Sequence, residues 1–81
     1  MMSNQLHLLY EDDKKKVHAI SFITWRALSS YIWENHVRSF QINNDAGDTI
    51  IRVYYLPGKD TCKIEYYTNH IPPASFLAQI S

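Results

Sequence analysis

A run of β-branched and aromatic residues from Thr49 to Tyr67 is the feature that most constrains how this chain folds. The segment reads TIIRVYYLPGKDTCKIEYY, two strand-like halves around Leu-Pro-Gly-Lys-Asp, a pattern typical of an antiparallel hairpin. A four-residue loop, Pro57 to Asp60, sets Arg52 opposite Glu65, whereas a loop shorter by two residues sets Arg52 opposite Lys63. Like charges directly opposite each other destabilise a ladder. We therefore predict the four-residue loop.

This register gives the hairpin an inward and an outward row of side chains. The inward row is mainly apolar and comprises Ile51, Val53, Tyr55, Cys62, Ile64 and Tyr66. The outward row mixes tyrosines, charges and aliphatic side chains, and with a preceding strand it comprises Val37, Ile50, Arg52, Tyr54, Lys63, Glu65 and Tyr67. A water-exposed sheet face is expected to be mainly polar, so the mixed outer face is the surface most in need of an explanation.

Composition narrows the class of protein. The 81 residues are 46% apolar and 20% charged, which is typical of one folded domain spanning residues 1–81. Eight basic and eight acidic residues give a formal net charge of zero, which disfavours a general attraction to nucleic acid or anionic membranes. Cys62 is the one cysteine, so an intrachain disulfide is impossible and a reducing, cytoplasmic location is expected. The sequence predicts neither a standard export signal nor a membrane-spanning segment.

A first hairpin is predicted near the N-terminus. The segments 6–11 and 16–23 are rich in apolar residues and flank a charged turn, Asp12-Asp13-Lys14-Lys15. Pairing Asp12 with Lys15 puts one set of side chains on one face, namely Leu6, Leu8, Tyr10, Val17 and Ala19, and a second set on the other, namely His7, Leu9, His18, Ile20 and Phe22. Because both faces are partly apolar, we expect this ribbon to be covered on two sides.

One convincing helix is predicted over residues 24–35. Thr24 is suited to the N-cap, because its hydroxyl can accept a bond from an unpaired backbone N–H of the first turn. Leu28, Tyr31, Ile32 and Asn35 occupy the i, i+3, i+4 and i+7 positions of a helical stripe, which Ala27 extends. Trp33 points away from this stripe. It either packs under a neighbouring strand or loop, or serves as an anchor for a partner, a role in which tryptophan is enriched.

The remaining strands complete an α+β domain. Segments 37–43, 48–56 and 61–68 form a predicted meander, with Asn43 opposite Asp48 and Phe40 meeting Ile51. Residues 74–80 form a short helical tail, which is too short to be stable alone and must dock. The predicted architecture is a small antiparallel sheet in the order ββαβββ, with helix 24–35 packed on the face of Phe40, Ile51, Val53, Cys62 and Ile64.

No motif in the chain predicts catalysis or a bound group. The two glycines, Gly47 and Gly58, lie in separate turns, so there is no glycine-rich phosphate loop. The four histidines and Cys62 lack the spacing of a zinc site. Cys62 falls in the inward row, where a thiol behaves as a small hydrophobe. We therefore predict no catalytic, cofactor-binding or metal-binding residues, no cofactor, and a protein that is not an enzyme.

The functional hypothesis rests on the outer face of the meander. Three explanations compete: the tail or the first hairpin covers the face, another protein or a second copy binds it, or it stacks the bases of single-stranded nucleic acid. The favoured function is a small protein-binding module, such as an inhibitor, antitoxin, immunity protein or phage-type antagonist. Its predicted partner-binding residues are Arg52, Tyr54, Lys63, Tyr67 and Trp33. Nucleic-acid binding by the Tyr/Arg/Lys face is the alternative, and a small hydrolase or ribonuclease using histidine chemistry ranks third.

Overall fold

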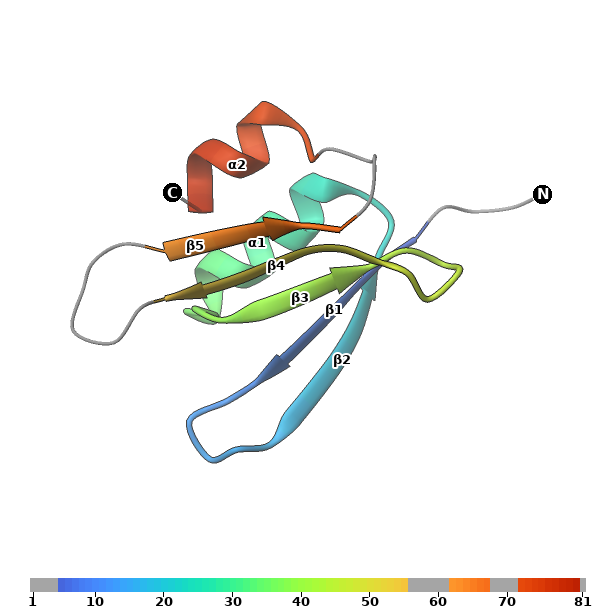
Figure 1. Cartoon of the computed structure of the whole chain (residues 1–81). Coiled ribbons are helices and arrows are strands. Elements are labelled where there is room, and N and C mark those ends of the chain that lie inside the picture. Colours follow the sequence, from blue (N-terminus) through green and yellow to red (C-terminus); the bar gives the residue numbers. More distant parts are fainter. Residues whose placement is uncertain (1–4, 56–61, 68–71, 81) are drawn as a thin grey trace.

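The protein has the predicted α+β architecture. A computed structural model describes residues 5–55, 62–67 and 72–80. Along the chain the elements are β1 (Leu6–Glu11), β2 (Val17–Phe22), α1 (Trp25–Glu34), β3 (Phe40–Asn43), β4 (Thr49–Tyr55), β5 (Cys62–Tyr66) and α2 (Ala74–Ile80) (Figure 1). The strands form one antiparallel sheet in the order β2-β1-β3-β4-β5. β1 therefore joins the predicted first hairpin directly to the predicted meander.

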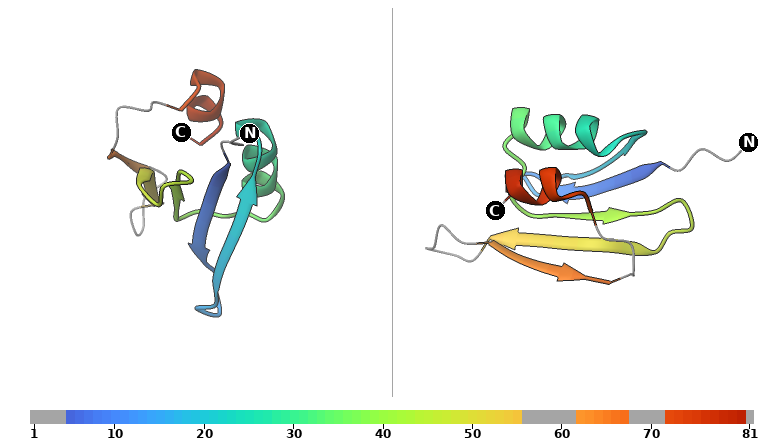
Figure 2. Two further views of the ribbon diagram at one scale, coloured as in Figure 1. Left: turned by 90° about the vertical axis from the view of Figure 1, so that its right-hand side faces the viewer. Right: turned by 90° about the horizontal axis from the view of Figure 1, so that it is seen from above.

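Both helices lie on the same side of the sheet (Figure 2). We call this side the helix face and the opposite side the open face. The core fills the space between the sheet and the helices, and includes Leu28 and Ile32 of α1 and Phe76 of α2. The Phe76 ring packs against the ring of Trp25 with centroids 4.9 Å apart. The tail thus docks beside α1, as its short length requires.

The way α1 ends explains why β3 begins at Phe40 and not at the predicted residue 37. Thr24 Oγ1 accepts a hydrogen bond from the N–H of Ala27 at 3.1 Å, which is the predicted N-cap. At the other end His36 has a positive φ of 52°, and the N–H of Val37 donates to the carbonyl of Ile32 at 3.0 Å. This is a Schellman motif, in which an apolar residue after the helix packs back on the last turn. Val37 is buried for that reason, and its predicted place in the outer strand row is wrong.

A β-bulge corrects the predicted pairing of β3 with β4. Ile42 lies opposite Ile51, but the next residue, Asn43, lies opposite Thr49. Ile50 is the extra residue, and it is buried in the core instead of on the outer face where it was predicted. Bulges add one unpaired residue and bend the strand that carries it. Local alternation along β4 cannot reveal such an insertion.

The turn before β4 shifts the partner of Phe40. The carbonyl of Asn44 accepts from the N–H of Gly47 at 3.0 Å, and Gly47 adopts the left-handed region with φ 88°. Together with the bulge, this turn sets Phe40 opposite Val53. The prediction that Phe40 meets Ile51 is wrong, although Phe40 does lie in the core.

The first hairpin has a register one residue away from the predicted one. Lys15 donates its N–H to the carbonyl of Asp12 at 2.9 Å and has φ 63°, and the N–H of Asp12 donates to the carbonyl of Lys16 at 3.0 Å. The Asp12 carboxylate also accepts the N–H groups of Lys14 and Lys16, each at 2.9 Å. A residue in the left-handed region after the turn adds one position to the loop.

A shift of one residue turns every side chain of β2 to the other face. His18, Ile20 and Phe22 therefore share the helix face with Leu6, Leu8 and Tyr10. Val17, Ala19 and Ser21 share the open face with His7 and Leu9. The predicted division of this hairpin is wrong, and the ribbon packs against α1 on one side only among the described residues.

Candidate functional site

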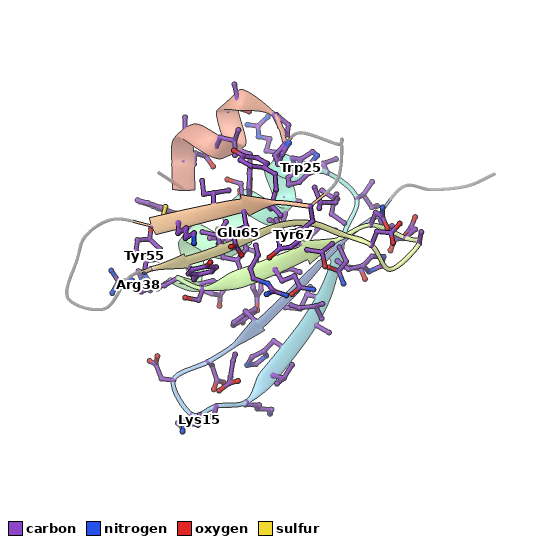
Figure 3. All side chains as sticks on the ribbon, in the orientation of Figure 1. Lys15, Trp25, Arg38, Tyr55, Glu65 and Tyr67 are labelled. Atoms are coloured by element: carbon purple, nitrogen blue, oxygen red, sulfur yellow. The ribbon has the colours of Figure 1, made fainter. Side chains whose placement is uncertain are left out.

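The hairpin of β4 and β5 has the predicted register. Arg52 lies opposite Glu65 and Tyr54 lies opposite Lys63; the predicted loop 57–60 lies outside the described residues. Alternation along the two strands directs these side chains to the open face. Tyr67 follows β5 in the same row, with its N–H donating to the carbonyl of Ile50 at 3.0 Å. We call the group Arg52, Tyr54, Lys63, Glu65 and Tyr67 the open-face cluster; Figure 3 labels Glu65 and Tyr67.

Glu65 is the acceptor at the centre of this cluster. The Tyr67 hydroxyl donates to Glu65 Oε1 at 2.7 Å, and Lys63 Nζ lies 3.7 Å from Glu65 Oε2. Hydrogen bonds from Tyr67 and Tyr54 lower the pKa of the Glu65 carboxyl, with smaller help from the charges of Lys63 and Arg52. The same bond to Glu65 raises the pKa of Tyr67. At neutral pH the cluster therefore holds an ionised Glu65 carboxylate beside a protonated Tyr67.

Each cation of the cluster lies over a tyrosine ring. The guanidinium carbon of Arg52 is 5.5 Å from the ring centroid of Tyr67, and Lys63 Nζ is 5.9 Å from that of Tyr54. Both distances are within the range of a cation–π contact. The cluster thus pairs each cation with an aromatic ring and presents both donors and aromatic surface.

Gln41 of β3 extends the cluster and was not among the predicted site residues. Arg52 Nη2 donates to Gln41 Oε1 at 2.9 Å, and Gln41 Nε2 donates to Asn43 Oδ1 at 2.9 Å and to Thr49 Oγ1 at 3.0 Å. The alternation of Phe40 and Ile42 as inward residues already places Gln41 outward. The signal was therefore present in the sequence.

The pairing of β1 with β3 brings a second polar group to the open face. His7 Nδ1 lies 2.8 Å from Ser21 Oγ, and His7 Nε2 lies 2.8 Å from Asp45 Oδ1. Asp45 Oδ2 accepts the N–H of Gln5 at 3.0 Å. That backbone bond and the bond to His7 lower the pKa of Asp45. No local sequence pattern links residues so far apart along the chain.

The described residues leave the open-face cluster uncovered. The tail, one of the predicted covers, packs on the helix face through Phe76. The first hairpin, the other predicted cover, continues the sheet edge to edge instead of lying over it. Arg52 is exposed, and the side chains of Lys63 and Tyr67 are about half exposed.

Trp33 is separated from the cluster by the sheet. It lies on α1 with 77% of its surface exposed, so the prediction that it packs under a strand or loop is wrong. It lines a surface pocket of about 430 Å³ with Ser29, Ser30 and Gln79. The predicted site residues therefore form one group of four on the open face and one tryptophan on the helix side.

A third cation–π pair lies near Trp33. The guanidinium carbon of Arg38 is 4.9 Å from the ring centroid of Tyr55 (Figure 3). Both residues line a pocket of about 310 Å³ that also includes Trp33 and Gln79. This helix-side surface has an aromatic and cationic character of its own, but it shares no residue with the open-face cluster.

The third hypothesis, a hydrolase or ribonuclease, requires histidine chemistry. The histidine of β2, His18, makes contacts within the first hairpin. His18 Nε2 lies 2.9 Å from Asp12 Oδ2, and the ring of Tyr10 stacks on His18 with centroids 4.7 Å apart. The Tyr10 hydroxyl lies 2.6 Å from that of Tyr31, which raises the pKa of Tyr10 to about 12. A tyrosine with such a pKa keeps its proton at neutral pH.

Over residues 5–55, 62–67 and 72–80, no three His, Cys, Asp or Glu side chains gather closely enough to hold a metal ion. Cys62 is partly buried. Neither α1 nor α2 has the length and apolarity needed to cross a membrane. Comparison of the chain with protein-family models, curated proteins and solved structures finds no match.

Proposed function

We propose that the protein is a small, non-enzymatic binding module whose open face docks another protein through the open-face cluster. The observation that carries this proposal is a set of two tyrosines and two cations in mutual contact, on a sheet face that no described element covers. Tyrosine and arginine are enriched among the residues that dominate binding energy at interfaces. Inhibitors, antitoxins, immunity proteins and phage-type antagonists work in this way. The lone Cys62 fits a reducing compartment such as the cytoplasm.

The fixed geometry of the cluster supports binding because less freedom remains to be lost. Ordering a long, flexible side chain at an interface costs about 0.5–1.5 kcal/mol. Arg52 is already held by Gln41 and the ring of Tyr67, and Lys63 by Glu65 and the ring of Tyr54. A partner that meets these side chains does not have to immobilise them first.

The charge pattern favours a protein partner over nucleic acid. Glu65 lies between the cations, with Lys63 Nζ 3.7 Å from its carboxylate, so phosphate groups would meet a negative charge at the centre of the cluster. The cations also cover one face of each tyrosine ring, which reduces the area available for base stacking. Nucleic-acid binding by the same face remains the alternative.

The test compares two adjacent tyrosines of equal exposure. Tyr67 is 50% exposed on the open face, and Tyr66 is 51% exposed on the helix face. A partner is first co-purified from the native source, and its affinity is then measured with purified proteins by calorimetry. We expect Tyr67→Ala to weaken binding by about 10–30-fold, as for an interface hot spot, while Tyr66→Ala leaves the affinity within about twofold.

Three further measurements decide between the hypotheses. Urea melts should show that Tyr67→Ala changes the free energy of unfolding by less than about 1 kcal/mol, since surface substitutions are usually mild. Trp33→Ala should leave the affinity unchanged if the open face alone binds. A single-stranded oligonucleotide that binds with a steep salt dependence, lost in Tyr67→Ala, would instead establish the nucleic-acid alternative. Equal affinity of both tyrosine variants would refute the proposed site.

A further inference from the structure

The two edges of the sheet differ in how they are protected against pairing with another strand. β5, at one edge, is five residues long and contains Lys63 and Glu65. β2, at the other, is six residues long, reads VHAISF and contains neither lysine, arginine, aspartate, glutamate, glycine nor proline. Natural proteins usually blunt an edge with charges, proline or bulges, because unpaired peptide groups are a template for another strand. β2 has none of these devices along its six residues.

The peptide groups that face away from β1 can be assigned from the turn. Asp12 and Lys16 are joined by a backbone hydrogen bond, and hydrogen-bonded and non-hydrogen-bonded pairs alternate in an antiparallel ladder. The peptide groups of Val17, Ala19 and Ser21 are therefore directed toward the free edge. The side chains of these three residues are exposed as well.

Exposed apolar surface gathers at the same edge. Val17 at the start of β2 is 68% exposed, and Ile23 directly after its end is 74% exposed. Among the described residues these are the two most exposed large aliphatic side chains. Single exposed apolar residues are ordinary, but here both stand at the ends of one uncharged edge.

We infer that β2 pairs with β2 of a second copy of the chain, antiparallel about a two-fold axis, to join two sheets into one. The outward peptide groups restrict such pairing to registers in which odd-numbered residues face each other. With Ile20 facing itself, Ala19 faces Ser21 and Val17 faces Ile23, so the exposed aliphatic side chains of one copy lie opposite those of the other. In the competing register Ala19 faces itself, and the charged Lys16 of one copy would then lie opposite the apolar Phe22 of the other. Charge and apolar matching select the register centred on Ile20.

The lysines next to β2 favour an antiparallel dimer over a parallel one. Lys14, Lys15 and Lys16 all precede β2, and no lysine, arginine, aspartate or glutamate lies between them and the end of the strand. Parallel pairing would bring the two lysine runs together, whereas antiparallel pairing places them at opposite ends of the new ladder. The same edge thus has a preferred direction and a preferred register for its own copy. This inference is independent of the open-face cluster.

Charge exchange across the interface tests the proposal. We expect sedimentation equilibrium of the wild-type chain to show dimers that dissociate on dilution. A chain carrying Ala19→Lys and Ser21→Lys places like charges opposite each other at both symmetric positions, and its dimer dissociation constant should rise at least about tenfold. A chain carrying Ala19→Glu and Ser21→Glu should behave in the same way. Mixing the two should restore dimers of one lysine and one glutamate chain.

A matched control makes the same two kinds of substitution, alanine to lysine and serine to lysine, on α1 instead of β2. Ala27→Lys with Ser30→Lys adds the same charge to exposed positions of α1 and should leave the dimer intact. A wild-type chain that stays monomeric at millimolar concentration would overturn the proposal. So would a mixture of lysine and glutamate chains that remains monomeric while each chain is folded by circular dichroism.

Disulfide trapping tests the register separately. Ile20 facing itself would be a non-hydrogen-bonded pair, whose Cα atoms approach to about 4.5 Å and suit a disulfide. In a Cys62→Ser background, Ile20→Cys should form a cross-linked dimer on mild oxidation, whereas Ala19→Cys, which faces Ser21, should not. Cross-linking of Ala19→Cys alone would show the other register and overturn the one proposed.

Discussion

Ile51 is one of the fully buried residues of the core. It lies between Ile42 of β3 and Tyr66 of β5. Ile51→Ala should lower the free energy of unfolding by about 2–5 kcal/mol, because the change loses transfer energy and leaves a cavity. Ile64→Ala should cost less, since Ile64 is only partly buried. Urea melts measure both.

The control for this prediction is Val17→Ala on the open face. Val17 is 68% exposed, so removing two methyl groups there should change the stability of the monomer by less than about 0.5 kcal/mol. A similar loss for Ile51→Ala and Val17→Ala would contradict the division into a helix face and an open face.

Asp12 gives the first hairpin a dependence on pH. Its bond to His18 and the backbone N–H of Lys16 lower its pKa from the ordinary value of 3.8. A carboxyl with a lowered pKa in the folded state contributes stability above its unfolded pKa, and this contribution is lost as the pH falls through the folded pKa. We expect Asp12→Asn, which keeps an oxygen for the turn, to lose less stability between pH 5 and pH 3 than the wild type.

The measurement is a series of urea melts of both proteins from pH 7 to pH 3. Asp45 and Glu65 also have lowered pKa values, so both proteins should lose stability in acid, and the slope should be shallower in the variant. Identical slopes for wild type and Asp12→Asn would show that the Asp12 contacts add nothing to the folded state.

At the scale of elements, the sequence predicts a strand register correctly where local pattern decides it. The prediction fails where a turn or a bulge adds a residue to the loop or strand. The β4–β5 register is correct because opposite charges at Arg52 and Glu65 exclude the nearest competitor. The two other registers are wrong because local alternation does not anticipate their backbone features. In the first hairpin this is Lys15 in the left-handed region of a turn, and between β3 and β4 it is the turn at Gly47 together with the bulge at Ile50. Both errors arise from backbone conformation, not from burial preference.

In the candidate site too, local pattern predicts some contacts and not others. Arg52, Tyr54, Lys63 and Tyr67 come together because they occupy one face of one predicted hairpin. Trp33 does not join them, since the helix packs on the opposite side of the sheet. The contact between His7 and Asp45 depends on the neighbours β1 and β3, and strand order across a helix is not encoded in any local spacing.

At the scale of the whole molecule, the core and the proposed binding surface lie on opposite sides of one sheet. The core lies between the sheet and both helices, and α2 contributes Phe76, which is 2% exposed and packs on Trp25. An 81-residue domain has a total stability of only about 5–15 kcal/mol. A short terminal helix can therefore decide whether the chain folds at all, and it does so from the side of the sheet opposite the proposed binding surface.

Phe76→Ala is the prediction that tests this division. Truncating a buried phenylalanine should cost about 3–5 kcal/mol, so the variant should unfold at a much lower urea concentration than the wild type. Gln79→Ala, an exposed change on the same helix, should cost less than about 0.5 kcal/mol. At a temperature where Phe76→Ala is still folded, its affinity for an open-face partner should equal that of the wild type, because α2 and the open-face cluster lie on opposite sides of the sheet. A stable Phe76→Ala chain that has lost its partner would mean that the tail itself binds, and that the division of labour between the two faces is wrong.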